Sequence, residues 1–177
     1  MNERTWSNTL NSWGRVARLL HWVLAALLIL QWFAGKFDDA FGGRRFHISL
    51  GVTLLALVLL RLIWRATQPV PAAPSNSPAW ERALARLTHY AWYVLLIALP
   101  LTGILSVQGE GRSIVWFGLF ELPSVVAVDK GFAHDMEEVH EALSTVFLVL
   151  LALHVLAALK HQFVDKDGLL WRMWRGR

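Results

Sequence analysis

The chain has 177 residues, of which 55% are hydrophobic and only 17% are charged. A soluble domain typically has about 25% charged residues, so this composition, with a mean hydropathy of +0.42, indicates a membrane protein. The absence of cysteine excludes disulfides, thiolate zinc sites, iron–sulfur clusters and covalently attached haem. The net charge of +4 does not indicate nucleic-acid binding, because the positive residues flank apolar segments and form no single patch.

Four apolar segments are each close to the ~20 residues that a helix needs to cross about 30 Å of hydrocarbon. In chain order they cover about 16–34, 47–64, 87–107 and 139–159. The sequence therefore predicts an all-α membrane protein, a bundle of four transmembrane helices that forms a single domain over residues 1–177. No convincing cleavage site follows the first segment, so we expect it to be retained and not removed as a signal peptide.

Each of the first two segments has a histidine near one end. His21 lies just inside the first segment, and His47 opens the second. Arg44 and Arg45 come immediately before His47. Arg61 lies inside the second segment near its far end, where a long side chain can reach the headgroups.

The two later connections differ in character. A proline-rich linker, residues 68–78, precedes the third segment, which contains Pro100 as a kink that a membrane bundle tolerates. The connection 108–138 is the longest and the most acidic, and its aromatic stretch 114–120 is more typical of an interfacial turn than of a fifth span. His134 in this connection is expected to be a solvated surface residue.

The distribution of Lys and Arg predicts the topology. The N-terminal tail, the second connection and the C-terminal tail together hold eleven of these residues, while the first and third connections hold five. The positive-inside rule therefore places both termini in the cytoplasm. In this orientation His21 lies near the cytoplasmic face and His47 near the periplasmic face.

The last segment contains two histidines on nearly the same helical face. His140 and His154 are 14 residues apart, which is about 3.9 turns and about 21 Å of helix rise. His154 lies among apolar residues, where an ionisable side chain is costly and suggests a functional site. Matching depths pair His21 with His154 and His47 with His140.

Two histidines that face each other in an apolar bundle are typical of the axial ligands of low-spin haem b. Zinc would require three or four ligands that converge at one point, and no local cluster suits copper. We therefore predict two haem b groups per chain. The alternative for any single histidine at the end of a span is a role as an interfacial anchor.

Seven short motifs, in this order and with these spacings, carry a family resemblance. They are residues 18–22 (RLLHW), 46–51 (FHISLG), 59–65 (LLRLIWR), 88–90 (THY) with 98–103 (ALPLTG), 139–143 (VHEAL), 152–154 (ALH) and 159–161 (LKH). With them the chain resembles the bacterial cytochrome b561 family, especially its small four-helix members of the superoxide:ubiquinone oxidoreductase type.

The resemblance implies a multi-pass protein of the bacterial inner membrane that transfers electrons. It implies that superoxide is oxidised at the periplasmic haem and that ubiquinone accepts the electrons. The haem ligands that it carries over are His21, His47, His140 and His154. The expected partners are ubiquinone, membrane lipid, and superoxide or another periplasmic electron donor. The sequence is also compatible with a homo-oligomer, but nucleic acid is not an expected partner.

Several further residues are candidates for a role in this chemistry. Arg44 and Arg45 would attract an anionic substrate, with membrane anchoring or haem-propionate pairing as the alternative. His161 lies about two turns beyond His154, and with Lys160 it would supply protons to a quinone. Alternatively, His161 or His89 could bond a haem propionate or replace His21 as an axial ligand. His89, Lys160 and Arg61 are candidates for contact with a haem propionate or the quinone.

Two other functional classes remain open at this point. The chain could be a cytochrome b anchor subunit that passes electrons from a partner dehydrogenase to quinone, like the cytochrome b subunits of membrane hydrogenases. It could also be a haem-free bundle such as a transporter or scaffold. Purification as a lone active oligomer would exclude the first class, and a coloured preparation would exclude the second.

Overall fold

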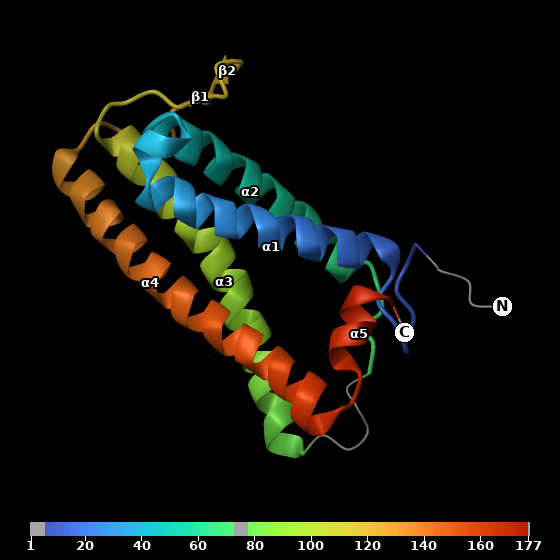
Figure 1. The fold of residues 1–177 in the computed structure, drawn as a ribbon. Helices are drawn as coiled ribbons and strands as arrows, with labels where there is room; N and C mark the ends of the chain where they lie inside the picture. Colours follow the sequence, from blue (N-terminus) through green and yellow to red (C-terminus); the bar gives the residue numbers. More distant parts are fainter. Residues whose placement is uncertain (1–5, 73–77, 177) are drawn as a thin grey trace. The chain divides into compact units, whose positions relative to one another are not determined.

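A computed structural model describes residues 6–72 and 78–176, so part of the proline-rich linker lies outside the described residues. Each of the four apolar segments lies in a helix that is long and apolar enough to cross a membrane. Figure 1 shows these helices, which are α1 (Arg15–Lys36), α2 (Arg44–Ala66), α3 (Ala79–Gly109) and α4 (Lys130–Lys160). The predicted four-helix membrane architecture is confirmed.

Short elements fill the connections. A 3-10 helix, Asp38–Phe41, links α1 to α2, and strands β1 (Val115–Trp116) and β2 (Phe120–Glu121) form an antiparallel hairpin between α3 and α4. The aromatic stretch 114–120 is thus a turn-containing hairpin and not a fifth helix. After α4 follow a π-helical turn, His161–Asp165, and the short helix α5, Leu169–Trp174.

The long helices extend beyond the apolar segments. The third helix begins at Ala79 and not near residue 87, and α4 begins at Lys130 and not near residue 139. Apolar residues mark only the part of a helix inside the hydrocarbon, whereas backbone hydrogen bonds continue into the headgroup region. His134 therefore lies in α4 and not in a loop, but its side chain is 70% exposed beside Glu138, as expected for a solvated residue.

Contacts between residues divide the chain into two compact units, and each contains part of every long helix. Unit 1 comprises residues 1–23, 59–93 and 148–177, and unit 2 comprises residues 24–58 and 94–147. The buried apolar residues of unit 2 come from all four long helices and from the connection after α3. They include Leu24, Leu50, Leu54, Leu95, Ile114 and Phe147.

The C-terminal residues of unit 1 fold back onto the first turns of α1. Trp22 donates a hydrogen bond through Nε1 to the carbonyl oxygen of Met173 (3.2 Å), and its ring contacts Trp174. Arg172 donates to the carbonyl oxygens of Ala72 and Asn11, at 2.9 Å each. From the sequence this tail is only a source of positive charge, and α5 is not predicted.

Most of the apolar surface of the long helices is not covered by protein. In the most apolar 18-residue stretch of the span Lys130–Asp165, only 6% of the residues are buried. Large side chains such as Val149, Leu153 and Leu156 are exposed. Soluble monomers rarely expose contiguous apolar surface on this scale. Lipid is the environment that this surface requires.

The direction in which the helices cross the membrane stays a prediction from the Lys and Arg distribution. We expect alkaline phosphatase fused after Arg177 to be inactive, because the prediction places the C-terminus in the cytoplasm and the enzyme requires the periplasm. The matched control is a fusion after Val128, between α3 and α4, which should be active. The opposite pattern of activities would reverse the assignment of the two faces.

Candidate functional site

In unit 2, His47 and His140 face each other. His47 lies on the first turn of α2, His140 lies in α4, and their ring centroids are 6.2 Å apart. A metal–nitrogen bond is about 2 Å long, so two nitrogen atoms that bind one metal ion from opposite sides lie about 4 Å apart. The centres of the two imidazole rings then lie on the order of 6 Å apart. The pair has the separation that two axial ligands of one iron require.

Backbone carbonyl groups orient both rings. Nδ1 of His140 donates to the carbonyl oxygen of Leu99 (2.8 Å), and Nδ1 of His47 donates to that of Gln31 (3.1 Å). A carbonyl oxygen only accepts, so these contacts place the proton on Nδ1 and leave the lone pair on Nε2, the atom that can bind a metal. Histidine ligands in metalloproteins are usually held in this way. In His47 the lone pair on Nε2 accepts from Nε2 of Gln31 at 3.2 Å.

Two glycines make room for these rings. A Cβ on Gly35 would lie 2.7 Å from Cε1 of His47, and one on Gly103 would lie 3.1 Å from Cε1 and Nδ1 of His140. The first distance is shorter than carbon atoms tolerate, and the second would force His140 to shift. The missing side chains on α1 and α3 therefore leave space beside the two histidines.

A cavity of about 720 Å³ in unit 2 includes both histidines in its wall. This volume lies in the range of cofactor and ligand pockets, about 300–1,000 Å³. Its apolar wall includes Leu28, Leu54, Val58, Leu96, Ile104 and Phe147. Charged side chains also line it, namely Lys36, Asp38, Arg44, Glu137 and Glu141. An apolar space with two facing imidazoles and charged groups fits a flat macrocycle that has carboxylate substituents.

Unit 1 contains the second pair. The ring centroids of His21 and His154 are also 6.2 Å apart. The ring centroids of Trp92 and His154 are 6.0 Å apart. Nη1 of Arg61 is buried, and within the described residues it has no hydrogen-bond partner. A buried guanidinium group without an acceptor is costly, and an anionic group such as a haem propionate would satisfy it.

The two remaining histidine candidates lie elsewhere in unit 1. His89 is exposed on α3, where its Nδ1 donates to the carbonyl oxygen of Ala85 at 2.6 Å. His161 begins the π-helical turn directly after Lys160, the last residue of α4. That it shares the face of His154 stays a prediction from the helical period.

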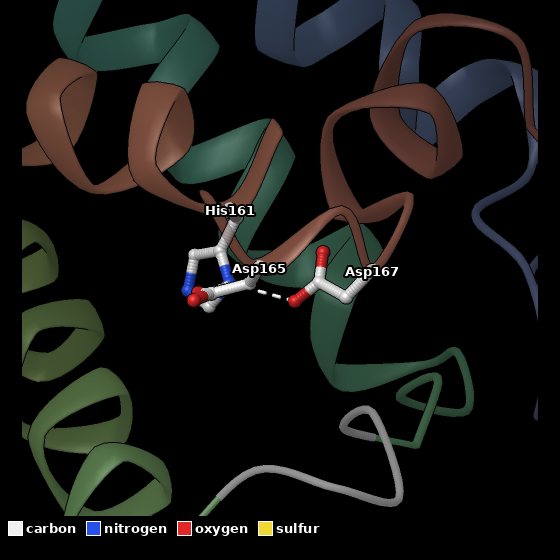
Figure 2. Close-up of side chains that lie close together, drawn as sticks. All are labelled: His161, Asp165 and Asp167. Atoms are coloured by element: carbon white, nitrogen blue, oxygen red, sulfur yellow. Dashed lines mark hydrogen bonds and ion pairs between the residues drawn. The ribbon is translucent and has the colours of Figure 1, made fainter. Parts of the chain in front are cut away.

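Figure 2 shows that His161 is held by two aspartates. Its Nδ1 lies 2.7 Å from Oδ2 of Asp167 and 3.1 Å from Oδ2 of Asp165. The ligand atoms of these residues are close enough together to hold a metal ion. However, Nζ of Lys160 lies 2.8 Å from the same oxygen of Asp165 and 3.0 Å from Oε1 of Glu81. The ammonium group already supplies positive charge here, so we interpret the cluster as an ion-pair network around His161.

The two arginines before His47 differ in their surroundings. Nη2 of Arg44 forms an ion pair with Oε1 of Glu137 (2.8 Å), and both side chains are partly exposed. Arg45 is an exposed cation on the same turn of α2. The positive rim expected from sequence is thus partly neutralised, because Glu137 compensates the charge of Arg44.

Sequence reasoning missed several residues around His47 and His140. Gln31 accepts from His47 through its backbone, and its side-chain Nε2 donates to the backbone oxygen of His47 at 3.0 Å. Thr102 is buried with its hydroxyl 3.4 Å from Nδ1 of His140. An amide inside an apolar span was the available signal for Gln31, because polar groups in the membrane usually mark function. Gly35 and Gly103 gave no comparable signal.

Four membrane-spanning helices that bring histidines together in facing pairs define the class of membrane-embedded b-type cytochromes. The comparison with known families supports this class. The family described as prokaryotic cytochrome b561 matches residues 12–176, and the chain belongs to this family. It is therefore a multi-pass bacterial membrane protein that binds haem b and transfers electrons.

The chain is similar along most of its length to characterised relatives. It is 32% identical over 182 residues to "Cytochrome b561 homolog 2" of Escherichia coli (strain K12), which covers 96% of this chain and 94% of that protein. It is 32% identical over 162 residues to "Probable superoxide oxidase CybB" of Yersinia pestis, covering 87% and 90%. It is 26% identical over 175 residues to "Cytochrome b562" of Cereibacter sphaeroides, covering 92% and 95%.

Proposed function

We propose that this protein holds two haem b groups and transfers electrons from superoxide to ubiquinone. His47 and His140 would bind one haem, and His21 and His154 the other. The observation that carries the proposal is the equal separation of 6.2 Å between the rings of both pairs. This separation is the one that a metal with two axial imidazoles requires, and it recurs in two separate compact units.

When bound, haem supplies reversible one-electron transfer. The protein residues decide where this chemistry is accessible. If His47 and His140 both bind the haem iron, they would block small oxygen species from it, and an oxidant or reductant would exchange electrons at the edge of the macrocycle. Apolar residues such as Leu54, Val58 and Phe147 line the cavity beside His47 and His140.

The choice of superoxide rests on the relative from Yersinia pestis whose name is "Probable superoxide oxidase CybB" and on the rim of the unit 2 cavity. Arg45 is an exposed cation that would attract an anion on the proposed periplasmic side. The reaction balances as two superoxide ions giving two molecules of oxygen and two electrons. Ubiquinone takes up these two electrons with two protons to form the quinol.

The two protons are the reason to place quinone reduction near His161 on the proposed cytoplasmic side. Asp167 and Asp165 hold Nδ1 of His161, which leaves Nε2 free to pass a proton to a quinone oxygen. The side chain of His161 is partly exposed, so water would return the proton to Nε2. Nζ of Lys160 forms an ion pair with Oδ2 of Asp165.

The test is a redox-difference spectrum of the purified protein, recorded with superoxide and a ubiquinone analogue added in turn. We expect superoxide to reduce the haem and the quinone to reoxidise it. His161→Gln should slow reoxidation and leave reduction fast, because only the quinone step consumes protons. His134→Gln, at an exposed position on α4, is the matched control and should change neither rate.

Two outcomes would contradict parts of this proposal. If superoxide reduces no haem, the electron donor is wrong and a dihaem carrier for another donor remains. If His161→Gln is reoxidised by quinone at the wild-type rate, His161 does not deliver the protons.

A further inference from the structure

The hairpin between α3 and α4 has an unusual turn. Its two central residues are Phe117 (φ 44°) and Gly118 (φ 77°), and Leu119 N–H donates to the carbonyl oxygen of Trp116 at 2.9 Å. Two consecutive positive φ angles define a type I′ turn, in which Asn is the favoured first residue and an aromatic residue is not. The backbone of a phenylalanine at this position is strained. The turn therefore does not explain why position 117 has a large apolar side chain.

The hairpin is attached to the side of α2 well inside the span. Nε1 of Trp116 donates to Oγ1 of Thr53, and Phe117 N–H donates to Oγ of Ser49, at 3.0 Å each. Ser49 and Thr53 are five and nine positions beyond the start of α2, or about 7 and about 13 Å along its axis. The helix has 23 residues, about 34 Å, which barely exceeds the ~30 Å hydrocarbon thickness. The hairpin, beside the first half of α2 in Figure 1, therefore reaches the depth of the hydrocarbon.

Non-helical backbone at this depth requires its polar groups to be satisfied by protein. Leu122 N–H donates to the carbonyl oxygen of Ile114 (2.8 Å), and the strands pair in register. The side chain of Gln108, buried at the end of α3, donates to the carbonyl oxygen of Pro123 and accepts from Val125 N–H. The segment is therefore a folded element that is held by α2 and α3.

The outer face of the hairpin is apolar and uncovered by the chain. Leu119 is 73% exposed, and Val115, Phe117 and Phe120 are also exposed. The charged group of the hairpin is at its base, where Glu121 accepts a hydrogen bond from the hydroxyl of Ser113. An apolar tip with a polar base matches the change from acyl chains to headgroups.

We propose that the β1–β2 hairpin is a lipid-inserted element whose tip, Phe117 to Phe120, contacts acyl chains of the leaflet at the α2 N-terminus. Lipid is the occupant that the structure favours, because the tip continues the lipid-covered surface of the spans and is attached to α2 at hydrocarbon depth. The hairpin anchors the connection between α3 and α4 to the membrane next to the His47–His140 pair.

The test uses the fact that the chain has no cysteine, so a single nitroxide label can be placed at will. Leu119→Cys is labelled in the full-length haem-loaded protein, in vesicles of phosphatidylethanolamine and phosphatidylglycerol. Relaxation of the label by oxygen, which concentrates in lipid, is compared with relaxation by a water-soluble nickel chelate. The controls are Leu153→Cys on the lipid-facing surface of α4 and Arg112→Cys at a charged, exposed position.

We expect the label at position 119 to behave as at 153, with oxygen the stronger relaxant, and unlike that at 112. Relaxation mainly by the nickel chelate would place the hairpin in water and overturn the proposal. Protection from both reagents would mean that a second copy or another protein covers the tip, which also overturns it.

A second variant separates the turn from its lipid contact. Phe117→Asn suits a type I′ turn but removes the apolar side chain. In this background we expect the label at position 119 to shift toward the nickel chelate, with haem content unchanged. A label that remains as oxygen-accessible as before would show that Phe117 does not anchor the tip.

Discussion

His140→Ala is expected to reduce the haem content from two to one per chain, and His154→Ala to remove the other haem. Each substitution removes one of two facing imidazoles, and the two pairs lie in different compact units. Loss of one site should therefore leave the other loaded. The measurement is pyridine haemochrome content relative to protein, with reduced-minus-oxidised spectra to identify the remaining haem.

Two matched variants refine this test. His134→Ala, on the same helix but 70% exposed, should retain both haems. Gly103→Val adds a side chain whose first carbon would already lie 3.1 Å from the ring of His140, so it should lower the occupancy of that haem only. One haem per wild-type chain, or two in His154→Ala, would show that the pairing is wrong.

Charge changes beside His47 should alter the rate of haem reduction by superoxide in opposite directions. Replacing both Arg44 and Arg45 by Gln removes two positive charges and should slow the reaction by on the order of tenfold at low ionic strength. Glu137→Gln should accelerate it, because this carboxylate neutralises Arg44 at 2.8 Å. Rapid-mixing absorbance measurements at several salt concentrations give the rates.

Salt provides the control for this electrostatic explanation. The Debye length falls from about 10 Å at 0.1 M to about 3 Å at 1 M, so the three proteins should converge as salt rises. A rate that is independent of salt and of both arginines would exclude steering. A lower haem content in the double Arg variant would instead support the alternative that these arginines pair with a haem propionate.

The class of protein could be predicted from local features of the sequence. An apolar segment of about 20 residues spans a membrane whatever its neighbours are, and the period of an α-helix relates His140 to His154 within one segment. The pairing of His21 with His154 and of His47 with His140 required only that partners lie at matching depths. The structure brings both predicted pairs together.

Local features also had limits. The helical period does not show what His161 contacts, and its imidazole interacts with Asp167 at the start of a π-helical turn. The apolar spans do not show where the helices begin, and α3 and α4 begin earlier, at Ala79 and Lys130, because polar residues can extend a helix beyond the hydrocarbon.

Only the tertiary structure decided what surrounds the histidines and the hairpin. The carbonyl groups of Leu99 and Gln31, the space beside Gly35 and the ion pair of Arg44 with Glu137 all join segments that are far apart in the sequence. Such contacts depend on how each helix is rotated about its axis and how closely its neighbours approach. The thickness of the hydrocarbon core and the rise of the helix determine which residues lie at the same depth. Side-chain packing determines which of these residues touch.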